Sequence, residues 1–348
     1  MSEIIAEAGE KKILICGGAG FIGSHFVRYL HNKYLNYKIF NFDLLTYAGN
    51  LENLIDLASS NRYQFIKGDI CDTKLLNDLF EKHRFDIVVN FAAETHVDRS
   101  IFNSVDFIHT NVEGVHSLLE VCRKYGIRRF VQISTDEVYG DVKVGFSDED
   151  APLRPSSPYS ASKAAADLII LSYVRTFQFP AVIVRGSNNF GPYQYPEKLI
   201  PLAVVSLLTG KKIPTHGTGE QVRNWLHVWD FCSAIDAVTH KAQDAQIFNA
   251  SNVYKKNIEV LEAIAKVLKK DLGAHKIHTK DRPGGDGRYA PDSAKIRREL
   301  GWSPRYSFDD QIGEVVSWYL DNREWWTKIL NKKEVWDHYQ KQFEAQYY

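Results

Sequence analysis

The sequence predicts an α/β protein, a Rossmann-type doubly wound parallel sheet with a smaller, interleaved C-terminal lobe. Short β-branched runs alternate with longer helical patterns through the first half of the chain, as in repeated βαβ units. The first of these runs leads directly into a glycine-rich turn, which is typical of such sheets. After Asn188, prolines interrupt shorter elements, which indicates a second lobe.

Six runs are predicted to be the parallel strands of the first lobe, joined by crossover connections. They are Lys12–Cys16, Lys38–Asp43, Tyr63–Lys67, Asp86–Phe91, Arg129–Ser134 and Ala181–Arg185. Apolar residues at helical spacing predict helices over Gly20–Leu30, Thr73–Lys82, Val105–Tyr125 and Ser160–Thr176.

The two lobes are expected to alternate along the chain, because Trp225–Val228 and Gln246–Ala250 have strand character and are predicted to return to the first lobe. The expected boundaries are 1–10 for a flexible leader, 11–187 with returns at about 224–252 for the first lobe, 188–223 and 253–330 for the second lobe, and 331–348 for a helical tail. We interpret four C-terminal aromatic residues as helix packing rather than a binding platform: Trp318, Trp325, Trp326 and Trp336.

Composition argues against several classes of function. The 348 residues include 43 basic and 43 acidic ones, so no global field attracts nucleic acid or an anionic membrane surface. No stretch approaches the roughly 18 apolar residues of a membrane span. The four cysteines are widely scattered and lack metal-type spacing. Three of them, Cys16, Cys122 and Cys232, lie in apolar stretches, and Cys71 does not. We therefore expect free thiols in a reducing cytoplasm and no metal.

The glycine-rich turn predicts a dinucleotide site. Gly17, Gly20 and Gly23 would let the backbone approach a pyrophosphate, whose charge the helix N-terminus offsets. Asp43 ends the second strand, twenty residues after Gly23, where a carboxylate can accept hydrogen bonds from ribose hydroxyls. A carboxylate there repels a 2′-phosphate, so NAD is favoured over NADP. A turn without a ligand and, for Asp43, a helix N-cap remain the alternatives.

Two further strand ends support this prediction. Asp69 follows the third strand and could meet an adenine amino group, while Ala92 and Ala93 follow the fourth and would let the backbone pass close to a cofactor. Each of these segments, taken singly, is also explained as an ordinary loop.

Catalytic side chains are expected at two places. Tyr159 and Lys163 stand four residues apart at the start of a helix, so that an ammonium could stabilise a phenolate that accepts a proton from an alcohol. Thr135, Asp136 and Glu137 end the fifth strand, at the sheet edge where open α/β folds bind ligands. Two adjacent acids can serve as acid and base if their pKa values differ. A solvated acidic loop is the alternative.

Six short segments carry more specific motifs: Leu45–Asn50, Thr95–Ser100, Ser134–Gly140, Ser187–Asn189, Tyr195–Pro201 and Asp281–Gly284. Together with the features above, they resemble the dTDP-glucose 4,6-dehydratase family, nucleotide-sugar dehydratases of the extended short-chain dehydrogenase/reductase type. The resemblance runs from about Lys12 to about Trp326.

The resemblance implies an NAD-dependent lyase that converts a nucleoside-diphosphate glucose, dTDP-glucose first of all, to its 4-keto-6-deoxy form in deoxysugar biosynthesis of the rhamnose type. Carbon 4 is oxidised, water leaves across carbons 5 and 6, and the hydride returns to carbon 6. On matching positions, Tyr159 is the base at the 4-hydroxyl, assisted by Lys163 and Thr135. Glu137 takes the proton from carbon 5, and Asp136 protonates the departing 6-hydroxyl.

The resemblance also makes the first lobe the NAD-binding domain and the second the nucleotide-sugar-binding lobe. With the residues above, the NAD contacts it implies are Gly17, Gly20, Phe21, Ile22, Gly23, Asp43, Leu44, Leu45, Thr46, Asp69, Ile70, Phe91, Ala92, Ala93, Glu94, Thr110, Tyr159, Lys163 and Asn189. The implied sugar-nucleotide contacts are Thr95, Thr135, Asn188, Lys198, Leu199, Pro214, His216, Arg223, Asn257, Asp281 and Arg282.

Several positions depart from the family pattern: His216 and Phe190 replace tyrosines, Gly186 a cysteine, Gly285 a histidine and Gly287 an arginine. They leave thymine and uracil open as the base, so a UDP-glucose 4,6-dehydratase is one alternative. An epimerase or decarboxylase of the same fold is another, although it would not need the two acids. A catalytically silent NAD-binding protein is the third. The resemblance further implies a homodimer built through helices of the first lobe.

Overall fold

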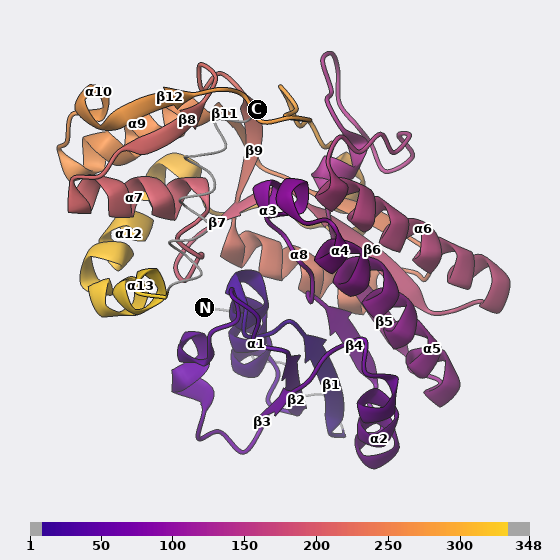
Figure 1. Ribbon diagram of the computed structural model, residues 1–348. Coiled ribbons are helices and arrows are strands. Elements are labelled where there is room, and N and C mark those ends of the chain that lie inside the picture. The colour runs from indigo at the N-terminus through magenta and orange to yellow at the C-terminus, as the bar shows by residue number, and fades with distance from the viewer. Residues whose placement is uncertain (1–8, 333–348) are drawn as a thin grey trace.

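Seven parallel strands form the central sheet of the first lobe (Figure 1). Their order is β10-β6-β5-β4-β1-β2-β3, and each neighbouring pair is parallel. The strands are β1 (Lys11–Cys16), β2 (Tyr37–Asp43), β3 (Tyr63–Lys67), β4 (Ile87–Asn90), β5 (Arg129–Thr135), β6 (Ala181–Gly186) and β10 (Ile247–Ala250). The order reverses between β1 and β4, as in the predicted Rossmann-type fold, and ligands of such sheets bind at that point.

The computed structural model describes residues 9–332. The predicted leader at 1–10 and tail at 331–348 therefore lie outside the described residues, except for 9–10 and 331–332, and so does Trp336. No helix within residues 9–332 combines the length and the apolar character needed to cross a membrane.

Helices cover both faces of the large sheet, which explains why its strands are apolar on both sides. In β1, Ile13 and Ile15 pack into one core and Leu14 and Cys16 into the other. The first core includes residues of α1 (Phe21–Lys33), α8 (Val228–Lys241) and α11 (Ala294–Leu300). The second includes residues of α2 (Thr73–His83), α5 (Val115–Tyr125) and α6 (Pro158–Phe177).

The long helix predicted over Val105–Tyr125 is interrupted. A short helix, α3 (Val97–Phe102), is followed by α4 (Val105–Ile108), a π-helical turn over His109–Gly114, and then α5. In the turn, Asn111 Nδ2 donates to the backbone oxygen of Glu94 at 3.0 Å and to Ser162 Oγ at 2.8 Å. These bonds hold the turn against the segment after β4 and against α6. Single π-helical turns of this kind often occur at functional sites.

The second lobe contains two small sheets and a helical layer. One sheet has the order β11-β9-β7 and the other pairs β12 with β8. These strands are β7 (Asn188–Phe190), β8 (Ile213–His216), β9 (Val222–His227), β11 (Val253–Lys256) and β12 (Lys276–Thr279). The helices are α7 (Leu199–Thr209), α9 (Asn257–Leu268), α10 (Leu272–His275), α12 (Phe308–Asp321) and α13 (Arg323–Leu330). Trp325 and Trp326 are buried in the core of this lobe and Trp318 packs against it, which confirms helix packing for these three residues.

Only one of the two strands expected to return to the large sheet does so. Gln246–Ala250 corresponds to β10, which pairs with β6. The run Trp225–Val228 instead falls mainly in β9, which pairs with β7 and β11 in the second lobe. The chain returns to the first lobe at α8, whose apolar residues join the core under α1. Strand character is local, whereas the choice of partner depends on distant segments, so the sequence pattern did not distinguish the two sheets.

A buried ion pair joins β6 to α6. Arg185 Nε donates to Asp167 Oδ2 at 2.9 Å, and the two side chains are 1% and 0% exposed. Arg185 Nη1 also donates to Tyr139 Oη at 2.8 Å, and that hydroxyl donates to Asn249 Oδ1 at 2.8 Å. The network therefore fixes α6 and the turn after β5 relative to the sheet.

Replacing Arg185 by methionine should destabilise the protein by about 3–5 kcal/mol, because Asp167 would remain buried without its charge partner. Arg298, which is 68% exposed in a surface pair with Glu299, provides the matched control, and Arg298→Met should cost less than about 1 kcal/mol. Chemical denaturation measures both free energies of unfolding. Equal, small losses in the two variants would show that the buried pair does not hold α6 in place.

Candidate active site

A cavity of about 440 Å³ opens at the carboxyl edge of the large sheet and is lined by both lobes. Its walls come from the ends of β1 to β6 in the first lobe and from the segments 186–200, 214–231, 257–261 and 282–289. The cavity therefore lies where the strand order reverses, which is the expected ligand position in this fold.

The cavity brings together nearly all of the predicted site residues. Of the predicted NAD contacts, Leu45 lies outside the lining, and of the predicted sugar-nucleotide contacts, Asp281 does. Leu45 has a left-handed backbone (φ 59°) and donates its amide to Asp43 Oδ1 at 2.8 Å. Asp281 Oδ1 accepts a hydrogen bond from Gln221 Nε2 at 2.8 Å. These two residues touch neighbours of the cavity rather than its interior.

The glycine turn has no room for side chains. A Cβ on Gly17 would lie 2.5 Å from the backbone nitrogen of Ala92, and one on Gly23 would lie 2.2 Å from the oxygen of Gly17. Gly20 is the N-cap of α1 and makes no side-chain cap, so the helix N-terminus presents backbone groups to the cavity. Bare backbone at a helix N-terminus suits a pyrophosphate.

Asp43 lies at the end of β2, on the cavity wall. Its Oδ2 accepts a hydrogen bond from the amide of Ala19 at 2.9 Å and its Oδ1 accepts one from Leu45 at 2.8 Å. Burial raises the pKa of this carboxyl, and the two amide bonds lower it. Asp43 caps no helix, since Asn50 caps the 3-10 turn over Leu51–Leu57. Its remaining lone pairs can accept ribose hydroxyls, so this carboxylate and the glycine turn fit an adenine dinucleotide.

Tyr159 and Lys163 project into the cavity from the first turns of α6. The helix starts there because Ser157 and Ser160 form a capping box and Pro158 occupies the first helical position. Lys163 Nζ donates to the backbone oxygen of Ile133 at 2.7 Å, and burial lowers its pKa to about 8.

The phenol of Tyr159 differs from the sequence-based expectation. Burial raises its pKa well above the ordinary value, the charge of Glu137 raises it further, and a hydrogen bond with Thr135 lowers it. The ammonium of Lys163 is directed at a backbone carbonyl, so the expected shift of the phenol towards neutrality is not produced by the protein alone.

Asp136 and Glu137 lie in a 3-10 turn that β5 presents to the cavity. Thr135 caps this turn, since its Oγ1 accepts the amide of Glu137 at 3.2 Å and donates to Asp136 Oδ1 at 3.4 Å. Asp136 is 2% exposed, and its Oδ2 has no hydrogen-bond partner among residues 9–332. A solvated acidic loop is therefore the wrong description of Asp136.

The surroundings of the two acids differ. Burial, followed by the charge of Glu137, raises the pKa of Asp136 well above its ordinary value. Burial also raises the pKa of Glu137, but three cations oppose this effect: Arg223, Lys198 and Arg282. Arg223 also lowers the pKa of Asp136, so Lys198 and Arg282 are the cations that distinguish the two acids, an arrangement that suits Asp136 as the acid and Glu137 as the base.

Two further lining residues, Glu197 and Tyr289, were not among the predicted site residues. Tyr289 Oη donates to Glu137 Oε2 at 3.4 Å, and the guanidinium of Arg223 lies 4.2 Å from the centre of the Tyr289 ring. Glu197 accepts hydrogen bonds from Tyr47 at 2.9 Å and Arg99 at 3.1 Å. Glu197 lies inside the Tyr195–Pro201 motif, which was the signal that could have found it, whereas Tyr289 only follows the Asp281–Gly284 motif.

Comparison with known proteins identifies the group to which this fold and site belong. The profile of the family described as GDP-mannose 4,6 dehydratase matches residues 14–315. A dTDP-glucose 4,6-dehydratase of Streptomyces niveus is 44% identical over 330 residues, covering 93% of this chain and 97% of the relative. The chain therefore belongs to the dTDP-glucose 4,6-dehydratase family of nucleotide-sugar dehydratases.

Solved structures agree with this membership. The dTDP-glucose 4,6-dehydratase of Bacillus anthracis, crystallised in complex with NAD, is 47% identical, with a TM-score of 0.86 over 92% of this chain and 99% of that one. The Streptomyces venezuelae enzyme, solved with NAD and TYD bound, is 42% identical, with a TM-score of 0.88 over 91% of this chain and 99% of that one.

Gly23→Ala should weaken NAD binding at least about tenfold, or about 1.4 kcal/mol, because the new Cβ would push the turn from its present shape. Gly313 lies inside α12 with no atom within 4 Å of an added Cβ. Gly313→Ala, the matched control, should keep the affinity and gain up to about 1 kcal/mol of stability. Isothermal titration with NAD measures both, and wild-type affinity in Gly23→Ala would contradict the assignment of the turn.

Proposed function

We propose that this enzyme dehydrates dTDP-glucose to the 4-keto-6-deoxy sugar nucleotide, with NAD as its bound cofactor. The observation that carries the proposal is the convergence of a phenol, an ammonium and two differently shifted carboxyls on the cavity that the glycine turn also lines. When bound, NAD would accept hydride from carbon 4 of the hexose and return it at carbon 6, and its oxidised ring would contribute a positive charge.

The acids divide the elimination between them. Glu137, opposed by three cations, removes the proton from carbon 5 once carbon 4 is a ketone, because the ketone acidifies that position. Asp136, buried and protonated, gives its proton to the 6-hydroxyl, which leaves as water. Glu137 then returns its proton to carbon 5, so this residue ends the cycle as it began.

After the elimination, Tyr159 has gained a proton and Asp136 has lost one, and Thr135 can carry a proton between them. Tyr159, as the phenolate that the positive charge of bound NAD would favour, accepts the proton of the 4-hydroxyl, whereas Asp136 loses a proton to the departing water. Thr135 Oγ1 donates to Asp136 Oδ1 and is hydrogen-bonded to Tyr159. A proton can therefore move from Tyr159 through Thr135 to Asp136, which restores both groups without bulk water.

The second lobe supplies the charge that a nucleotide diphosphate needs. Lys198, Arg223 and Arg282 line the cavity of a chain whose formal charges balance. Lys198 Nζ donates to the backbone oxygen of Thr95 at 2.9 Å, and Arg223 Nη2 donates to that of Asp286 at 2.8 Å. These bonds orient two cations before any phosphate arrives, which lowers the entropic cost of binding.

The acid pair favours dehydration over epimerisation. Burying carboxyl groups is unfavourable unless they are paired, and Asp136 keeps one oxygen without a partner among the described residues. An epimerase or decarboxylase would have no use for this unfavourable arrangement. The cavity residues of both lobes likewise favour an active enzyme over a silent NAD-binding protein.

The proposal extends to the setting of the enzyme. Its product would feed deoxysugar biosynthesis of the rhamnose type, residues 11–187 with the return at 228–250 would hold NAD, and the rest of 188–330 would hold the nucleotide sugar. A cytoplasmic setting suits four free cysteines. A homodimer is supported by apolar side chains exposed on α4 and α6: Val105, Ile108, Leu168 and Phe177.

Incubation of the purified chain with dTDP-glucose and, separately, UDP-glucose tests the proposed function. We expect dTDP-glucose to lose one water, which mass spectrometry would detect as a lower product mass. We expect UDP-glucose to react more slowly. Asp136→Asn and Glu137→Gln should each slow product formation about 10²- to 10⁴-fold, the usual contribution of a general acid or base.

The exposed Glu81 on α2 provides a matched control, and Glu81→Gln should leave the rate unchanged. Wild-type turnover in both Asp136→Asn and Glu137→Gln would refute the roles of the two acids. An unchanged mass of both sugar nucleotides with the wild-type chain would refute the dehydratase activity itself.

A further inference from the structure

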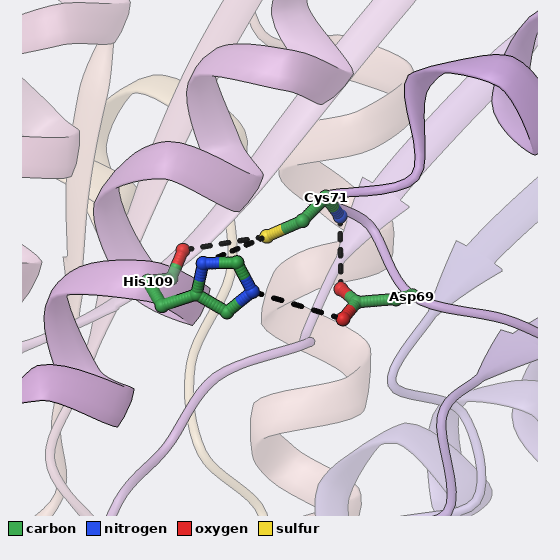
Figure 2. Close-up of side chains that lie close together, drawn as sticks. All are labelled: Asp69, Cys71 and His109. Atoms are coloured by element: carbon green, nitrogen blue, oxygen red, sulfur yellow. Dashed lines mark hydrogen bonds and ion pairs between the residues drawn. The ribbon is translucent and has the colours of Figure 1, made fainter.

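Three side chains of different metal-binding chemistry meet where the segment after β3 lies against the helical turn that begins at His109 (Figure 2). Asp69 and Cys71 lie in the segment between β3 and α2, and His109 begins the π-helical turn before α5. His109 Nδ1 is 3.9 Å from Cys71 Sγ, and His109 Nε2 is 3.9 Å from Asp69 Oδ2. One ligand atom from each residue lies within 4.8 Å of the others.

We propose that Asp69, Cys71 and His109 form a site for a thiophilic divalent cation, represented by Zn²⁺, and that its occupation weakens dinucleotide binding. Thiolate, imidazole and carboxylate are the zinc ligands of proteins, and a bound zinc holds such atoms about 3.5 Å apart. The Nε2–Oδ2 distance of 3.9 Å is slightly longer than this, and the side chain of His109 is half exposed, so its ring can turn to bring Nε2 closer to the Cys71 sulfur. A thiolate ligand favours zinc over Mg²⁺ or Ca²⁺.

A fourth residue orients the histidine. Glu113, one turn further on, contacts His109 Nδ1 through its Oε2 at 2.8 Å. A carboxylate there accepts the Nδ1 proton, which leaves the lone pair of Nε2 on the side of Asp69. Carboxylates that hold histidines in this way are the usual outer partners of zinc sites, so Glu113 acts as a positioning residue.

The electrostatic field at Cys71 favours a cation over a free thiolate. The carboxylates of Asp69 and Glu113 lie 3.9 Å and 2.8 Å from the two ring nitrogens of His109, so both negative charges are close to the proposed site. The same two carboxylates would attract a divalent cation, and the cation would then displace the thiol proton. The other three cysteines, Cys16, Cys122 and Cys232, are buried away from solvent, so Cys71 is the accessible thiol of the described chain.

The effect on the cofactor follows from the position of Asp69. Gly68, Asp69, Ile70 and Thr110 all line the cavity, so the cation site and the cavity share the Asp69 carboxylate. This half of the proposal rests on the proposed function, because it requires adenosine at Asp69. A carboxylate that coordinates a metal cannot also accept the adenine amino group with the same lone pairs, so the two ligands must weaken each other equally.

Titration of Co²⁺ into the untagged full-length enzyme tests the metal site. We expect one bound equivalent with thiolate-to-cobalt charge-transfer absorbance, which Cys71→Ser abolishes. Glu113→Gln should weaken binding about 10- to 100-fold. His109→Gln should weaken it at least as much, whereas His116→Gln, on an exposed histidine of α5, should bind as the wild type. Absence of the absorbance in the wild type, or its survival in Cys71→Ser, would overturn the site.

Zn²⁺ added to the NAD-loaded enzyme tests the coupling. We expect release of dinucleotide into an ultrafiltrate from the wild type and none from Cys71→Ser. Metal binding without release would overturn the shared use of Asp69. Mass loss of water from dTDP-glucose in the absence of added metal reports separately on the dehydratase activity, so failure of the metal site and failure of the proposed function are distinguishable.

Discussion

Two adjacent carboxyl groups held in a buried turn are the constraint on which the rest of this structure depends. Asp136 and Glu137 follow the last residue of β5, and burial raises the pKa of each. Such groups persist only where the surrounding fold holds them rigidly. The buried Arg185–Asp167 pair fixes α6 against the sheet, and the cap by Thr135 fixes the turn itself. The positions of the two acids in the cavity therefore depend on the packing of the residues around them.

The second lobe gives the two acids different electrostatic surroundings. Lys198 and Arg282 oppose the effect of burial on the pKa of Glu137, and Arg223 opposes it at both acids, whereas at Asp136 the charge of Glu137 adds to the effect of burial. A protein with balanced formal charge thus creates a locally positive wall, which also suits a diphosphate. The cations come from the second lobe and the acids from the first, and both line the same cavity.

Much of the fold could be predicted because its signals are local. The apolar runs of β1 to β6, the glycine turn and the spacing of Tyr159 and Lys163 each lie within a few residues, and family motifs located most of the lining. Contacts between distant segments could not be predicted in this way. The pairing of β9 with β7 and β11, the bond from Tyr289 to Glu137, and the approach of Cys71 to His109 all depend on tertiary folding. For the same reason, cysteine spacing gave no indication that Asp69, Cys71 and His109 lie close together.

Tracing deuterium from carbon 4 of dTDP-glucose tests most directly whether one cavity carries out oxidation, elimination and return of hydride on a single hexose. The purified chain would convert dTDP-[4-²H]glucose, and nuclear magnetic resonance would locate the label in the product. Convergence of the phenol and the acid pair on one sugar ring predicts deuterium at carbon 6 of the 4-keto product. Deuterium that remains at carbon 4 or passes into the solvent would contradict the account.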